Sequence, residues 1–235
     1  MEKPLLCANW KENKDLGEAK NWVLVIGEKV SQVKKPVIAC VPFPFIFPLY
    51  EQISQKGWQD HIWLSAQDIS HFEEGAHTGE VSAEMLLPAC KFCLVGHSER
   101  RKYFGEKDED VSQKIKELLE LKITPILCLA DSSQLDFYLK QAPLLKSEET
   151  ILVYEPPDAI SGGGAYHPED PGEVNLEVGK IKEKIVGKLV LYGGSVNPDN
   201  ISLFLAQPNI DGALVGQASL DPQSFLTLFE KACVL

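Results

Sequence analysis

Short apolar runs alternate with amphipathic stretches along the whole chain. Eight runs are apolar over nearly their entire length, as expected of strands buried on both faces of a parallel sheet. They are Leu5–Ala8, Val37–Val41, His61–Ala66, Phe92–Val95, Thr124–Leu129, Ile151–Tyr154, Leu189–Tyr192 and Gly212–Val215. Eight such strands in 235 residues predict an α/β fold, a single-domain closed (β/α)8 barrel over residues 1–235. The alternative, an open doubly wound sheet, needs a glycine fingerprint after the first strand, where Asn9–Glu12 stands instead.

The stretches between these runs have helical periodicity. After the first and the fourth run, apolar residues recur every three or four positions. These two stripes are Leu16, Ala19, Val23, Ile26 and Val30, then Val111, Ile115, Leu118 and Leu119. Asn197–Pro198 and Asp221–Pro222 each pair an N-cap side chain with proline, which predicts helix starts. Short helices are predicted at Val81–Leu87 and at about Leu135–Lys140.

Composition narrows the class of protein. The net charge is −11 and no basic cluster is longer than Arg100–Lys102, which argues against nucleic acid and acidic membranes as partners. Without a signal segment or a run of transmembrane length, we expect a cytoplasmic protein whose six cysteines are reduced. Cys90 and Cys93 have C-x-x-C spacing within a strand-like run, where residues three apart point to opposite faces, so we interpret them as structural thiols.

Polar residues cluster at the carboxyl ends of the predicted strands, which share one face of a barrel. They are Asn9 and Lys11, Gln67, His97 and Glu99, Glu155, Gly193–Ser195 and Gly216–Ser219. Glycine-containing turns after the last two strands are typical of a phosphate site built from backbone N–H groups. A lysine, a histidine and a carboxylate beside them suit proton transfer next to a carbonyl on a small phosphorylated substrate. Singly, each could be a solvated or structural residue, but their joint placement favours a site.

The stretch Ile151–Gly164 has the residues expected of a catalytic base followed by a loop that closes over it. A strand ends at Glu155, two prolines follow, and three consecutive glycines come later. A surface loop with a solvated acid is the alternative for this stretch alone. No metal site is expected, because the other histidines lack ligand spacing and carboxylate companions. Those histidines are His61, His71, His77 and His167.

Five motifs resemble the triosephosphate isomerase family in identity, order and spacing. They are Asn9-Trp10-Lys11, GHSERR at 96–101, YEPP at 154–157 with AISGG behind it, YGGSV at 192–196 and LVGQASL at 214–220. The resemblance covers essentially the whole chain. It implies a TIM barrel that interconverts dihydroxyacetone phosphate and D-glyceraldehyde 3-phosphate through an enediolate, in glycolysis and gluconeogenesis, without a cofactor.

The resemblance also implies roles for particular residues. Glu155 would move the proton and a neutral His97 would act on the two oxygens, as is known of this family. Lys11 and Asn9 would hold the developing oxyanion, with Glu99 as the ionic partner of Lys11. Phosphate would be bound, largely by backbone N–H groups, at Ser161, Ser195, Gly216 and Gln217, under an apolar roof that includes Ile160.

The loop at 68–79 resembles the one that family members insert into a partner subunit. This implies a homodimer in which Thr78 reaches the partner's Asn9 and the partner's Lys11. The segment Asp131–Thr150 is short, as in archaeal members of the family, some of which are tetramers. A tetramer therefore stays open.

Three positions depart from the family pattern. Asp158 stands where many members have tryptophan, and Ser161 and Gln217 stand where glycine is usual. At Ser161 and Gln217 a Cβ atom approaches the phosphate and narrows the allowed φ range. The glycines at Gly162–Gly164 raise the entropy lost on lid closure. We therefore expect weaker phosphate binding or a shifted lid equilibrium.

Two other functions remain as alternatives. Another phosphate-binding barrel enzyme, such as an aldolase or a tryptophan-pathway isomerase, is one; an aldolase needs a Schiff-base lysine at a mid-barrel strand end, where neither Lys122 nor Lys188 is placed. A catalytically silent barrel, kept as a binding or scaffold protein, is the other. It would lack the base or the electrophile, whereas Lys11, His97 and Glu155 are all present.

Overall fold

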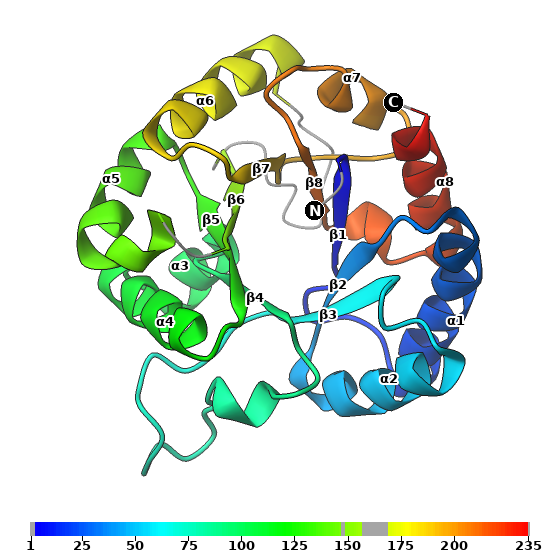
Figure 1. The fold of residues 1–235 in the computed structure, drawn as a ribbon, viewed down its shortest axis with the longest axis horizontal. Coiled ribbons are helices and arrows are strands. Elements are labelled where there is room, and N and C mark those ends of the chain that lie inside the picture. The colour runs from blue at the N-terminus through cyan, green and yellow to red at the C-terminus, as the bar shows by residue number, and fades with distance from the viewer. Residues whose placement is uncertain (1–2, 147–148, 157–168, 235) are drawn as a thin grey trace.

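The computed structural model describes residues 3–146, 149–156 and 169–234. Its parallel strands form a closed barrel in chain order, and the last strand pairs with the first (Figure 1). The strands are β1 (Leu5–Asn9), β2 (Val37–Val41), β3 (Ile62–Ala66), β4 (Phe92–Val95), β5 (Thr124–Leu129), β6 (Ile151–Tyr154), β7 (Leu189–Tyr192) and β8 (Gly212–Val215). The predicted (β/α)8 barrel is confirmed, and closure excludes the open sheet.

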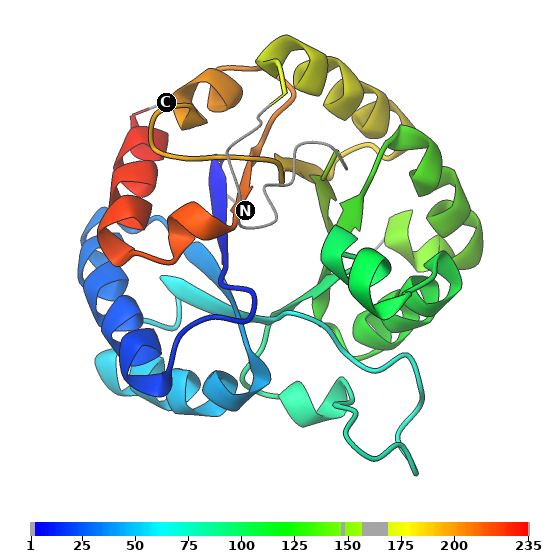
Figure 2. The same ribbon diagram turned by 180° about the vertical axis from the view of Figure 1, so that it is seen from behind.

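Helices surround the barrel on its outside (Figures 1 and 2). The α-helices are α1 (Leu16–Val33), α2 (Phe43–Lys56), α3 (Ser98–Phe104), α4 (Asp108–Glu120), α5 (Ser132–Gln141), α6 (Pro171–Lys184), α7 (Ile201–Leu205) and α8 (Pro222–Cys233). Short 3-10 helices are η1 (Glu84–Leu86), η2 (Pro143–Lys146) and η4 (Gln217–Ser219). The predicted helix at Val81–Leu87 is therefore wrong in type and length, because the residue before Pro88 takes an extended conformation.

Capping side chains explain which predicted helix ends are right. The Asp221 carboxylate accepts the Ser224 N–H at 2.9 Å, and α8 begins as predicted. Asp131 caps α5 in the same way, so this helix begins earlier than predicted. The helix start predicted at Asn197–Pro198 comes too early: the Asn197 side chain accepts the N–H groups of Asp199 and Asn200, as an N-cap does, but the residues before Ile201 form only a turn. Helix α7 begins only at Ile201.

The strands are buried on both faces because they separate two cores. In β1, Leu5 and Cys7 pack inside the barrel, whereas Leu6 and Ala8 pack outwards against the helices. The stripe predicted on α1 is buried except at its first residue, Leu16, which is 38% exposed at the helix start.

The C-x-x-C pair does not follow the alternation expected of a strand. Cys90 precedes β4, and both Cys90 and Cys93 belong to the outer core, so the expectation of opposite faces is wrong. Burial raises the pKa of the Cys90 thiol to about 12, which makes it unreactive near neutral pH.

No helix in the described ranges is both long and apolar enough to cross a membrane.

Candidate active site

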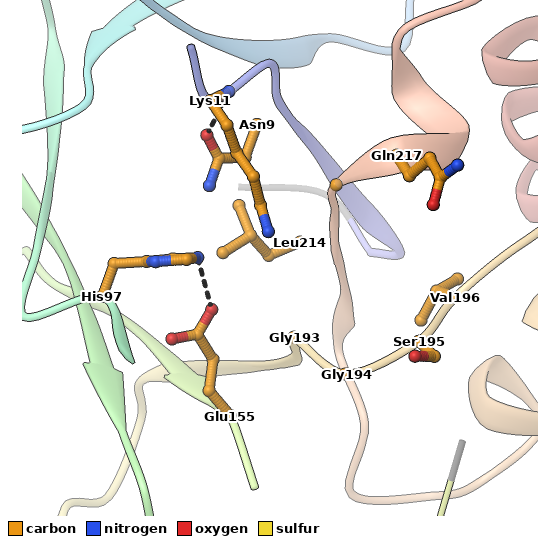
Figure 3. A pocket seen from close by; sticks show the side chains of 11 residues that line it. Asn9, Lys11, His97, Glu155, Gly193, Gly194, Ser195, Val196, Leu214 and Gln217 are labelled. Atoms are coloured by element: carbon orange, nitrogen blue, oxygen red, sulfur yellow. Dashed lines mark hydrogen bonds and ion pairs between the residues drawn. The ribbon is translucent and has the colours of Figure 1, made fainter. Parts of the chain in front are cut away.

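The carboxyl ends of five strands surround one pocket (Figure 3). Its lining residues are Asn9, Lys11, His97, Glu155, Gly193, Gly194, Ser195, Val196, Leu214, Gly216 and Gln217. Nine of the polar and glycine residues predicted at strand ends are among them, and a tenth predicted residue, Glu99, contacts Lys11. Ile160, Ser161, Asp158 and Gly162–Gly164 lie outside the described residues.

Glu155 is a buried carboxylate, 3% exposed, on a rigid strand end. Its backbone N–H donates to Leu129 O at 2.8 Å, which extends the pairing of β6 with β5 past the strand. Its Oε1 lies 3.1 Å from His97 Nε2, and its Oε2 accepts the Ser98 N–H at 3.2 Å. Cys128, inside the barrel, donates its thiol to the same carboxylate. Burial alone would raise the pKa of Glu155. His97 and these donors lower the pKa by more than burial raises it, so the net shift is downward and the group is a carboxylate near neutral pH.

His97 lies between two charged residues at the start of α3. Its Nδ1 accepts the backbone N–H of Glu99 at 3.2 Å, so Nδ1 carries no proton here and Nε2 donates to Glu155. Burial lowers the pKa of His97, whereas the charge of Glu155 raises it, and the net shift is upward. The upward shift therefore depends on direct contact with the Glu155 carboxylate.

The Arg101 side chain stabilises the sharp turn of the chain at the end of β4. Gly96 has φ +69, and a Cβ there would lie 2.8 Å from Arg101 Nη2, so only glycine fits. Arg101 Nε donates to Gly96 O at 2.9 Å, while its other nitrogens bind Asp108 and Tyr138. The guanidinium thus fixes the backbone that carries His97.

Lys11 enters the pocket from a strained turn after β1. Its φ of +53 lies in the left-handed region, which is unfavourable for a lysine. Its N–H donates to Asn9 Oδ1 at 3.1 Å, and its ammonium lies 2.6 Å from Glu99 Oε1, so the expected ion pair is present. Figure 3 shows the Lys11 side chain extended into the pocket, on the same side as His97.

Gln67, which the sequence marks only as a polar residue at a strand end, holds this turn in place. Its Nε2 donates to Lys11 O at 3.0 Å and Cys40 O at 2.9 Å, and lies 3.4 Å from Asn9 Oδ1. A lone glutamine at a strand end was the only available signal. Ser98 lies within the GHSERR motif, but the donation of its backbone N–H to Glu155 was not predicted, and Cys128 belongs to no recognised motif.

Glycine-containing turns form the opposite side of the pocket. Gly193 packs directly against the base, since a Cβ there would lie 2.7 Å from Glu155 Cγ. At Gly194 a Cβ would lie 2.2 Å from the Tyr192 hydroxyl oxygen. The Gly193 N–H itself donates to Tyr154 O at 2.8 Å, so an anion would be bound by other backbone N–H groups of these turns. Gln217 is exposed, and Figure 3 shows its side chain away from His97 and Glu155.

Two tyrosines attach the chain at Glu169, where the described residues resume, to the barrel. The Tyr192 hydroxyl accepts the Glu169 N–H at 3.3 Å, and the Tyr154 hydroxyl donates to its carboxylate at 3.2 Å. Glu169 is thereby held against the ends of β6 and β7. Within the described ranges, no three His, Cys, Asp or Glu residues group as metal ligands.

Comparison with known proteins agrees with this geometry. The sequence profile described as "Triosephosphate isomerase" matches residues 4–232. A triosephosphate isomerase of Thermus thermophilus is 36% identical over 253 aligned residues, which cover 99% of this chain and 100% of that protein. A triosephosphate isomerase of Endomicrobium trichonymphae is also 36% identical, over 97% of this chain and 98% of its own length. A third, from Picosynechococcus sp., is 37% identical over the same shares.

Proposed function

Because the chain belongs to the triosephosphate isomerase family, we propose that it interconverts dihydroxyacetone phosphate and D-glyceraldehyde 3-phosphate with Glu155 as the base. It is an intramolecular aldose–ketose isomerase. The observation that carries the assignment of the base is the buried Glu155 carboxylate, 3.1 Å from His97 Nε2 and packed against Gly193. A buried, ionised carboxylate beside a neutral N–H donor suits proton transfer at a carbon next to a carbonyl.

Substrate binding changes the partners of both groups. A carbonyl oxygen placed between His97 and Glu155 replaces their direct contact, which removes the interaction that raises the pKa of His97. Burial then keeps the imidazole neutral, with its Nε2 proton directed at the carbonyl. Glu155 is simultaneously free to accept a proton from the adjacent carbon.

The proposed reaction has two proton transfers at carbon. Glu155 removes a proton from one carbon, and the resulting enediolate oxygen is stabilised by His97 Nε2–H and the Lys11 ammonium. His97 moves a proton between the two oxygens, and the protonated Glu155 then returns its proton to the neighbouring carbon. Glu99 keeps the Lys11 ammonium in place, and Asn9 supports the same turn.

The phosphate end of the substrate belongs on the glycine side. Ser195, Gly216 and Gln217 line it, and their backbone N–H groups suit three phosphate oxygens. By position in the family motifs, Ser161 adds a further N–H and Ile160 an apolar roof. Both lie outside the described residues, so they enter the proposal by family resemblance alone.

We further propose a homodimer formed through the loop at 68–79. This loop projects from the barrel in both views, as the cyan-to-green segment after β3 (Figures 1 and 2). Stacked rings support its projection, with the Phe72 and His77 centroids 4.3 Å apart, and Thr78 is exposed. Asp68, at its base, lies 2.6 Å from the buried ammonium of Lys114.

A groove beside the active site offers the receiving surface. It reaches from Asn9 and Lys11 to the exposed rings of Phe43, Tyr103 and Phe104. An apolar, aromatic-rich patch of this kind is typical of a protein interface. Sedimentation of the protein at micromolar concentration should give twice the chain mass; a monomer would contradict the dimer, and a fourfold mass would indicate the tetramer.

We also propose a single barrel domain over residues 1–235 and a cytoplasmic location in glycolysis and gluconeogenesis, supported by the family match over 4–232. A coupled assay of D-glyceraldehyde 3-phosphate isomerisation tests the function. The expected result is turnover that saturates with substrate. Folded protein without turnover would instead support the silent scaffold, which no present observation favours.

A further inference from the structure

Two side chains outside the pocket bind the carbonyl ends of the turn that follows β8. Lys14 Nζ donates to Leu220 O at 2.5 Å, and Trp22 Nε1 donates to Ser219 O at 2.8 Å. The same turn begins with Gly216 and Gln217, which line the pocket on the proposed phosphate side. Donors from the loop after β1 and from α1 thus hold one end of a turn whose other end faces the pocket.

The turn behaves as one unit because it is closed on itself. Ser219 is fully buried, and both its N–H and its hydroxyl donate to Gly216 O, at 2.9 and 2.7 Å. Movement of the Ser219 and Leu220 carbonyls is therefore transmitted to Gly216. The positions of the backbone N–H groups of Gly216 and Gln217 therefore depend on where Lys14 and Trp22 hold the carbonyls of Leu220 and Ser219.

Both donors are themselves fixed. Trp22 is fully buried, and its ring packs against Trp10 and Phe225 at centroid distances of 5.0 and 5.1 Å. Lys14 has φ +77, a conformation unfavourable for a residue with a Cβ, and its ammonium lies 5.2 Å from the centre of the Trp10 ring. A strained backbone that persists at a lysine indicates a constraint on where this side chain reaches.

The loop after β1 that carries Lys14 also carries Lys11. This loop therefore lies near both the carbonyl end and the phosphate end of the proposed substrate site. A Cβ on Gly216 would lie 3.4 Å from Lys11 Cε, so the Lys11 side chain runs close beside the turn after β8. One substrate must meet Lys11 with its carbonyl and the turn with its phosphate at the same time. The spacing between these two loops therefore matters for binding.

We propose that Lys14 and Trp22 are positioning residues that set the phosphate-binding turn Gly216–Leu220 at the correct distance from Lys11. This inference rests on the proposed function, in which that turn binds the substrate phosphate. Neither residue touches substrate; both act through backbone carbonyls.

Variants of Lys14 test the proposal because this residue is only half-buried and its removal leaves the core intact. Lys14→Met keeps the stem over Trp10 and removes the donor, whereas Lys14→Arg and Lys14→Gln retain one. We expect Lys14→Met to raise KM for D-glyceraldehyde 3-phosphate about five- to tenfold, comparable to the loss of one ordinary hydrogen bond, with kcat within about twofold. Lys14→Arg and Lys14→Gln should recover most of the loss. The matched control, Lys20→Met, removes an exposed lysine of α1 and should change nothing.

Two further measurements separate positioning from charge and from general damage. Trp22→Phe changes no charge and should also raise KM. Unphosphorylated D-glyceraldehyde should be turned over with unchanged kcat/KM by Lys14→Met, because it never uses the turn. Equal losses on both substrates, or an unchanged KM in folded Lys14→Met, would overturn the proposal.

Calorimetric titration with inorganic phosphate tests the positioning role of Lys14 without relying on isomerase activity. We expect Kd for phosphate to rise in Lys14→Met by a factor similar to that in KM, whether or not the wild type isomerises triose phosphates. An unchanged Kd overturns the positioning role. A wild type that binds phosphate but does not turn over the sugar phosphate contradicts the proposed function alone.

Discussion

A single methyl group at Gly193 should damage both the base and the fold. In Gly193→Ala the new Cβ would lie 2.6 Å from Val153 Cγ1 and 2.7 Å from Glu155 Cγ. Carbon atoms in contact ordinarily stand about 3.5–4.0 Å apart, so both neighbours must move by close to an ångström. Gly193 does not have a positive φ, so the effect is steric rather than conformational.

The structure sets the size of both effects. Overpacking of this kind costs about 1–3 kcal/mol, which lowers Tm by about 2–12 °C in a domain of this length. Displacing the base by an ångström should lower kcat about 100-fold, because proton transfer requires the carboxylate within hydrogen-bonding distance of its target. KM should change much less, because the phosphate contacts remain.

Coupled kinetics and thermal unfolding measure the two effects separately. In the double variant Val153→Ala/Gly193→Ala one of the two overlaps is relieved, so Tm should recover in part while kcat stays low. Gly17→Ala, in the first turn of α1, is the matched control and should keep full activity. A Gly193→Ala enzyme with kcat within twofold of wild type would refute the claim that this glycine positions Glu155.

Three further predictions concern charge and hydrogen bonding. Lys114→Met leaves two carboxylates without their buried ammonium and should lower the free energy of unfolding in urea by about 3–5 kcal/mol, whereas Lys20→Met should not. Gln67→Leu removes the donor to the Lys11 turn and should lower kcat about 10- to 100-fold; an unchanged kcat would exclude a positioning role. Glu155→Gln removes the charge that raises the pKa of His97 while burial continues to lower it. An NMR titration of the imidazole should therefore show a lower pKa than in the wild type, and an equal or higher one would contradict the coupling.

Most of the architecture was predictable because its physical causes are local. Strands buried on both faces must be apolar throughout, so all eight were visible as uninterrupted runs. Once those strands form a closed barrel, their carboxyl ends meet on one face. The juxtaposition of Lys11, His97 and Glu155 follows from that rule without knowledge of any distance.

The residues that escaped prediction act through tertiary contacts. Gln67 was visible only as a polar residue at a strand end, because its role lies in donating to backbone carbonyls after two other strands. Cys128 reaches Glu155 from inside the barrel and leaves no sequence pattern. The turn at Asn197–Pro198 has the local signal of a helix start. Its path is instead set by Asn200, whose Nδ2 donates to Ser195 O at 2.8 Å and holds the chain beside the pocket.

The central claim is that Glu155 is the base of a triose phosphate isomerisation, and Glu155→Asp tests it most directly. This variant keeps the charge but withdraws the carboxylate by one methylene from His97 Nε2 and the Ser98 N–H. In a coupled assay of D-glyceraldehyde 3-phosphate, we predict robust wild-type turnover and a fall in kcat of about 100-fold in the variant, with KM little changed. A variant as active as the wild type would contradict the assignment of Glu155 as the base.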